Sequence, residues 1–173
     1  MLAPGTAAPA CWVIAFGNPQ RGDDGIGPYV AERLSDTIGR MNGVVLCSLP
    51  QLDLTLLEEI QGADHLIFVD ASVEALDNGL RWSPVTPELN GWAMGSHQLT
   101  PTVFLGLLHL LYQRRPTAWV LSVQGRQFDL GEGLSADARR DADRAAAQIV
   151  DWLYLHGIAL DGHNNRGKGR NHG

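Results

Sequence analysis

The chain has 173 residues, of which 45% are apolar, enough for one globular domain with a hydrophobic core. Its net charge of −6 is uneven, because residues 161–173 carry +2 and leave −8 for the rest. Nucleic-acid binding needs a basic face and a membrane span needs about 20 consecutive apolar residues, so neither partner is expected. The two cysteines lie in apolar runs, which fits a reducing compartment and predicts a cytoplasmic protein.

Apolar runs and helical periodicity alternate along the chain. Strands are predicted over 11–16, 44–49, 65–70, 80–85 and 119–123, and helices over 28–41, 53–60, 101–113 and 135–155. Thr100 and Ser135 are the expected caps of the last two helices, and Pro84 favours an edge position for its strand. The alternation predicts an α/β fold, a three-layer sandwich in which a mainly parallel sheet lies between helices.

The domain organisation follows from composition. We expect residues 1–160 to form a single α/β domain. Residues 161–173 are rich in Gly, Asn and Arg and contain no large apolar side chain. Such a segment cannot bury enough apolar surface to fold, so a disordered basic tail is predicted.

The glycine-rich turn between the first strand and the first helix contains the adjacent carboxylates Asp23 and Asp24. A turn that opens a helix normally suits a phosphate, but two carboxylates would repel an anion. The turn therefore favours a cation. Asp23 is expected to hold the turn or to pair with Arg21, and Gly25 and Gly27 are expected to leave room for a large substrate to approach the backbone.

Three residues are predicted to meet at one edge of the sheet. Asp24 follows the first strand, Asp70 ends the third strand, and His97 follows the fourth. Ligands of open α/β sheets bind beyond the carboxyl ends of the strands. Two carboxylates and an imidazole suit a divalent ion with an open coordination position. Taken singly, Asp24 could complement the helix dipole, Asp70 could cap a turn, and His97 could be structural.

Other catalytic motifs are missing from the sequence. It contains no Gly-x-Ser-x-Gly elbow, no Gly-x-Gly-x-x-Gly turn and no Walker-type Gly-Lys-Ser/Thr. Neither Cys11 nor Cys47 has an activating neighbour in the sequence. A serine or cysteine hydrolase and a nucleotide enzyme therefore have little support.

The motif Gly17-Asn18-Pro19-x-x-x-Asp23-Asp24-Gly25-x-Gly27, followed by an amphipathic helix, resembles the opening motif of the nickel–iron hydrogenase maturation endopeptidases. The resemblance extends, in the family's order, to 67–71, to Ser96-His97-Gln98 and to 131–135, and spans about residues 12–155. Segment 96–101 looks like the corresponding segment of those family members that serve soluble NAD-reducing hydrogenases.

This resemblance implies an endopeptidase that removes the C-terminal extension from a nickel-loaded hydrogenase large-subunit precursor. It also implies a twisted five-stranded sheet. Asp24, Asp70 and His97 match the family's metal-contacting and catalytic positions, the first of which is often Glu. The nickel would be supplied by the substrate, and the free site is expected to be empty or to hold an adventitious divalent ion.

Several alternatives remain open from the sequence. The ion could polarise the scissile carbonyl or activate a water, or it could only orient the substrate while Asp24 or Asp70 acts as the general base of an aspartyl-type peptidase. The turn at 18–22 and the loop at 82–96 are expected to grip the precursor. Other candidate functions are a metal-dependent chaperone without protease activity, and another hydrolase on a similar fold.

Overall fold

The computed structural model describes residues 9–90 and 99–158. The elements in chain order are β1 (Cys11–Phe16), the 3-10 turn η1 (Gly22–Gly25), α1 (Ile26–Ile38), β2 (Val44–Leu49), α2 (Leu56–Ile60), β3 (His65–Ser72), the 3-10 turn η2 (Asp77–Gly79), β4 (Leu80–Pro84), α3 (Pro101–Tyr112), β5 (Thr117–Gln124) and α4 (Ala136–Leu155). The predicted ligand His97 and the predicted tail at 161–173 lie outside the described residues.

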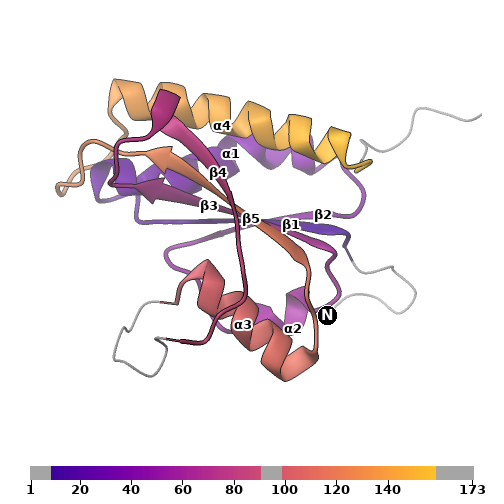
Figure 1. The fold of residues 1–173 in the computed structure, drawn as a ribbon. Coiled ribbons are helices and arrows are strands. Elements are labelled where there is room, and N and C mark those ends of the chain that lie inside the picture. The colour runs from indigo at the N-terminus through magenta and orange to yellow at the C-terminus, as the bar shows by residue number, and fades with distance from the viewer. Residues whose placement is uncertain (1–8, 91–98, 159–173) are drawn as a thin grey trace, which may run out of the picture.

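The five strands form one sheet in the order β2-β1-β3-β5-β4. All neighbouring pairs are parallel except β4 and β5, and β4 lies at an edge as Pro84 predicted. Helices α1 and α4 cover one face of the sheet, and α2 and α3 cover the other (Figure 1). The predicted three-layer α/β sandwich is confirmed.

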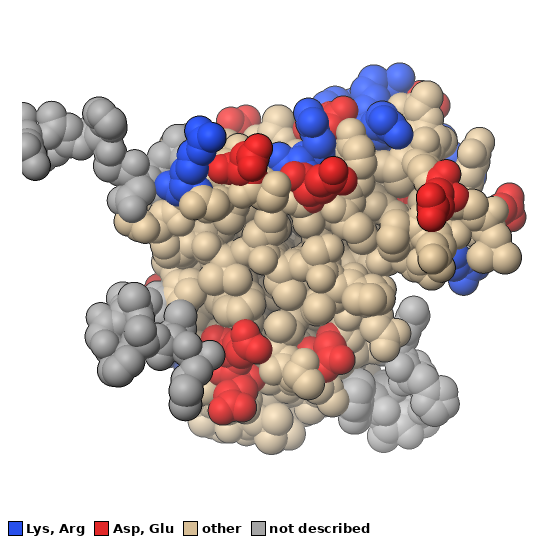
Figure 2. Space-filling model, turned by 180° about the vertical axis from the view of Figure 1, so that it is seen from behind, with Lys and Arg blue, Asp and Glu red and all other residues tan. Residues whose placement is uncertain are grey.

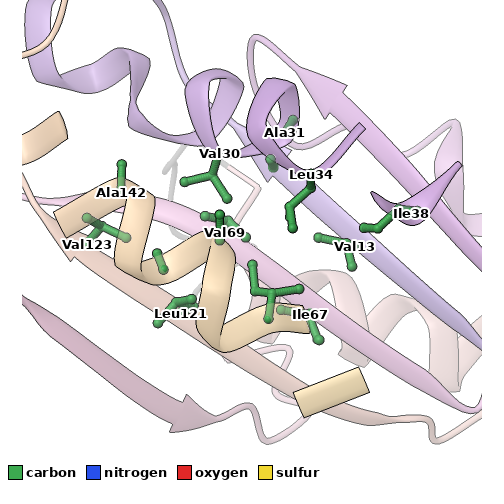
Figure 3. Close-up of a cluster of buried hydrophobic side chains, with 14 of the residues drawn as sticks. Val13, Val30, Ala31, Leu34, Ile38, Ile67, Val69, Leu121, Val123 and Ala142 are labelled. Atoms are coloured by element: carbon green, nitrogen blue, oxygen red, sulfur yellow. The ribbon is translucent and has the colours of Figure 1, made fainter. Parts of the chain in front are cut away.

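Successive side chains along each strand point to opposite faces of the sheet and so enter two separate cores. Val13, Ile67, Val69 and Leu121 face α1 and α4, where they pack against residues such as Leu34 (Figure 3). The intervening side chains of β1 and β3 pack instead against α2 and α3. Because β1 and β3 are covered on both faces, their sequences are almost continuously apolar.

Several element boundaries differ from the predicted ones. The first helix begins at Ile26 rather than at 28, because η1 leads directly into it. The second helix is shorter than predicted and begins at Leu56. Strands β3 and β5 are longer than predicted, because they pair along their whole length from His65 and Thr117 onward and supply each other's backbone hydrogen bonds.

Both predicted helix caps are confirmed. The Thr100 hydroxyl oxygen accepts from the Val103 N–H at 3.3 Å, and the Ser135 hydroxyl oxygen accepts from the Ala138 N–H at 3.3 Å. Each satisfies a backbone donor that has no partner inside the helix. These caps fix the starts of α3 and α4.

Charge is unevenly distributed on the surface. On the face shown in Figure 2, basic side chains gather mainly over the α1 and α4 layer, with acidic groups among them, whereas the α2 and α3 layer shows acidic groups. None of the helices in the described part of the chain is both long and apolar enough to cross a membrane.

Candidate functional site

The candidate site lies where the sheet reverses its strand order. Strand β1 is flanked by β2 on one side and β3 on the other, and the connections to them run over opposite faces of the sheet. In open parallel sheets such a switch point opens a crevice at the carboxyl ends of the strands. Asp24 follows β1, and Asp70 lies near the end of β3, so both belong to this crevice.

A cleft of about 420 Å³ occupies the crevice. It brings together the glycine-rich turn, the segment after β2 and the start of α3. Its lining residues are Phe16, Gly17, Asn18, Arg21, Asp24, Pro50, Gln51, Leu52, Asp70, Leu99, Thr100 and Pro101. The structure therefore brings together two of the three predicted site residues, although 46 residues of sequence separate them.

The two carboxylates interact electrostatically. Burial raises the pKa of Asp70 to about 6; the Ala71 N–H opposes this shift, and the nearby charge of Asp24 adds to it. Asp24 itself is half-buried, and its Oδ2 accepts from the Asn18 N–H at 3.0 Å. A cation between the two groups would relieve their repulsion, which is the property expected of a metal-contacting or substrate-contacting pair.

The third predicted ligand, His97, cannot be placed with them. It lies outside the described residues, which resume at Leu99 on the cleft wall. Within residues 9–90 and 99–158, no three His, Cys, Asp or Glu side chains cluster closely enough to hold a metal ion. The three-ligand set therefore stays a prediction.

Asp23 has a different role from its neighbour. Its side chain is fully buried and accepts hydrogen bonds from the N–H groups of Arg126 (2.7 Å), Gln127 (3.0 Å) and Ser135 (2.7 Å), and from the Ser135 hydroxyl (2.8 Å). Burial acts to raise the pKa of Asp23, but these bonds together lower it. The predicted supporting role is confirmed, but the partners lie between β5 and α4; a pairing with Arg21 does not occur.

The glycines of the turn allow parts of the backbone to pack closely against each other. A Cβ on Gly27 would lie 2.3 Å from the Phe16 carbonyl oxygen, and one on Gly25 would lie 2.9 Å from the Pro19 Cα. Both spaces are filled by backbone of the same turn. The expectation that these glycines leave room for a substrate was wrong, because Phe16 of β1 fills the space beside Gly27 and Pro19 fills the space beside Gly25.

Gly17 lines the cleft at a position that leaves no space for a side chain. Gly17 and Gly131 have nearly the same φ, 147° and 150°, but a Cβ on Gly17 would meet the Asp24 carbonyl oxygen at 2.0 Å whereas one on Gly131 meets nothing within 4 Å. We expect Gly17→Ala to lower the free energy of unfolding by at least about 2 kcal/mol more than Gly131→Ala. Urea unfolding of both variants measures this difference, and equal losses would contradict it.

The walls of the cleft differ in part from those predicted from the sequence. Asn18 and Arg21 line the cleft, which is consistent with the prediction that the turn at 18–22 contacts the precursor. Of the loop at 82–96, which was also expected to grip the precursor, residues 91–96 lie outside the described residues, and Trp82 at its start lies in β4 and packs on the α1 and α4 side. The segment from Pro50 to Leu52 was not predicted; its position directly after a parallel strand was the available signal.

The cysteines do not supply a nucleophile. Burial raises the pKa of Cys11 to about 12, and burial followed by the charge of Glu59 raises the pKa of Cys47. Both thiols therefore stay protonated near neutral pH, and neither lines the cleft. Among the described residues, the charged side chains that line the cleft are Arg21, Asp24 and Asp70.

The sequence matches no protein-family model and no curated protein. Its fold, however, matches solved structures of hydrogenase maturation proteases. The NiFe hydrogenase maturation protease HycI from Thermococcus kodakarensis KOD1 is 23% identical with a TM-score of 0.66, and the match covers 84% of this chain and 93% of that one. The hydrogenase maturating endopeptidase HybD from E. coli is 19% identical with a TM-score of 0.67, covering 85% and 93%.

A solution structure of an endopeptidase from Escherichia coli gives a similar result, with 21% identity, a TM-score of 0.68, and coverage of 86% of this chain and 94% of that one. At these identities the likeness shows the fold. The chain thus has the architecture of the hydrogenase maturation proteases over most of its length, with an acidic pair in a cleft at the switch point of its sheet.

Proposed function

We propose that this protein is an endopeptidase that removes the C-terminal extension of a nickel-loaded nickel–iron hydrogenase large-subunit precursor. The observation that carries the proposal is the convergence of Asp24 and Asp70 in one cleft at the β1/β3 switch point. Support comes from the fold, which is shared with solved hydrogenase maturation proteases. The cytoplasmic location and the NAD-reducing hydrogenase as target remain predictions from the sequence.

The proposed role of Asp24, Asp70 and His97 is to contact the nickel ion that the precursor carries. Oxygen and imidazole ligands suit a borderline divalent ion. The repulsion between Asp24 and Asp70 favours a cation between them. His97 is assigned this role from its place in the sequence, two residues before Leu99 on the cleft wall. Nickel is then part of the substrate, and cleavage depends on prior metal loading.

Asp70 is also the proposed proton acceptor. In the free site its pKa of about 6 leaves it mostly ionised near neutral pH, and the positive charge of the nickel would keep it ionised when the precursor binds. A carboxylate with this property can take a proton from a water molecule that attacks the scissile carbonyl. The thiols cannot take this part, because their pKa values are raised.

Mass spectrometry of the precursor tests the proposal. We expect the nickel-loaded precursor to lose its C-terminal extension on incubation with this protein, and the nickel-free precursor to keep its mass. An unchanged mass with a stable complex would overturn the proposal in favour of a chaperone. Hydrolysis of small amides, with the precursor untouched, would overturn it in favour of another hydrolase.

Substitutions at the first and third proposed contacts extend the test. We expect Asp24→Asn and His97→Ala each to slow cleavage at least 100-fold, because each removes a contact to the nickel that orients the precursor. Asp36→Asn, on the exposed side of α1, serves as the matched control and should cleave at the normal rate. Normal cleavage by either site variant removes that residue from the mechanism.

A further inference from the structure

A second pocket lies away from the cleft, between the edge of the sheet and α4. It has a volume of about 290 Å³ and is lined by Trp82, Trp119, Gln148, Asp151, Trp152 and Leu155. Trp119 lies near the start of β5, opposite Pro84 of β4, whereas the cleft lies at the other ends of the parallel strands. This pocket therefore has no part in the site described above.

The pocket walls are indole rings held in place by their neighbours. Trp82 and Trp119 lie edge to face, with their ring centroids 6.5 Å apart and their planes at 77°. The Trp82 indole N–H donates to Gln148 Oε1 at 2.9 Å. Trp152 stacks on His156, with 3.7 Å between ring centroids. Three of the chain's five tryptophans thus meet at one place, where all three are partly exposed.

Among the described residues that line the pocket, Asp151 alone carries a charged group. The other acidic residues of α4, which are Asp137, Asp141 and Asp143, each form an ion pair with an arginine. Asp151 is exposed and forms no ion pair with any residue in the described ranges 9–90 and 99–158. A negative charge beside aromatic faces is the arrangement that attracts an organic cation.

The pocket also lies beside an open sheet edge. Strand β4 pairs only with β5, so the backbone groups on its outer side have no strand partner in the described part of the chain. An extended segment of another protein could lie along this edge, since strand addition at a free edge is a common mode of peptide recognition. The neighbouring Leu155 side chain is 83% exposed and would be covered by such a segment.

We propose that this pocket receives an arginine side chain from an extended segment of a partner protein. The planar guanidinium would lie against the indole rings and donate to the Asp151 carboxylate, two interactions that arginine combines better than lysine does. Tryptophan and arginine are both enriched among the few residues that dominate the binding energy of protein interfaces. The proposal stands independently of the protease function, because it uses a different surface.

Nuclear magnetic resonance with a short peptide tests this proposal. The probe is a blocked pentapeptide with a central arginine flanked by valine and glycine, and its control replaces arginine by citrulline, which has the same shape but no charge. We expect the arginine peptide to shift the indole N–H signals of Trp82, Trp119 and Trp152 saturably, and to bind at least ten-fold more tightly than the citrulline peptide.

A pair of variants on the same helix completes the test. Asp151→Asn should weaken binding of the arginine peptide at least five-fold and leave the citrulline peptide unchanged. Asp143→Asn, which removes an acidic residue that already pairs with Arg33, should leave both peptides unchanged. Equal affinity for the two peptides, full affinity in Asp151→Asn, or indole signals that do not respond would each overturn the proposal.

Discussion

Asp70→Asn is expected to abolish precursor cleavage and at the same time to stabilise the protein above pH 6. Asp70 is held by burial and by the charge of Asp24 in a setting that disfavours its ionised form, so its pKa is raised to about 6. The asparagine amide fills the same space without a charge. If Asp70→Asn removes cleavage and raises the free energy of unfolding, Asp70 contributes to the reaction and not to the stability of the fold.

The pH dependence of this gain has a definite sign. Since the folded-state pKa of Asp70 exceeds its ordinary value of 3.8, the folded protein binds the proton more tightly than the unfolded chain. The native stability that protonated Asp70 contributes is complete below about pH 4 and is lost as the pH rises to about 6. The advantage of Asp70→Asn should therefore grow between pH 4 and 6, and level off at about 2–3 kcal/mol above pH 6.

Urea unfolding of wild type and Asp70→Asn at several pH values between 4.5 and 8 measures this advantage. Asp36→Asn, an exposed change on α1, is the control and should show no such rise. A constant difference between wild type and Asp70→Asn across the pH range would contradict the electrostatic account. Retained cleavage would contradict the proposed role of Asp70 as proton acceptor.

Asp23→Ala is expected to lower the free energy of unfolding by at least about 3 kcal/mol. The substitution leaves three backbone N–H groups and the Ser135 hydroxyl without their acceptor, and each buried unpaired donor costs about 1–3 kcal/mol. Because these bonds tie η1 to the segment between β5 and α4, we expect the cleft wall to loosen and cleavage to fall as well. The pKa of Asp23 is lowered, so its stabilisation is present above about pH 4 and is lost in acid.

A double-mutant cycle with Ser135 tests the Asp23 network. Ser135→Ala removes the hydroxyl that donates to Asp23 and caps α4, and should cost about 1 kcal/mol in the wild type. In the Asp23→Ala background the same change should cost at least about 0.5 kcal/mol less, because the hydroxyl has already lost its acceptor. Urea unfolding of the four proteins measures the coupling, and strict additivity would contradict a shared network.

Much of the architecture was predictable because it depends on local pattern. The apolar runs over 11–16 and 65–70 predicted buried strands, and the Thr100 and Ser135 caps predicted two helix starts correctly. The lengths of β3 and β5 were not predictable, since strand ends depend on pairing with a neighbour. Leu110 and Leu111, near the end of α3, are 57% and 61% exposed, because the covering of a helix depends on its neighbours rather than on its own pattern.

The sequence by itself determined the fold class, the glycine-rich turn with its two carboxylates, and the edge of the sheet where Asp24 and Asp70 meet, because strand direction in an α/β chain follows from the order of its elements. Only the tertiary structure decided which groups hold the buried Asp23 carboxylate and which segments line the cleft around Asp24. Two adjacent residues in a 3-10 turn point in different directions, and their partners come from segments about 50 and 100 residues away. Distant partners of this kind leave no trace in local pattern.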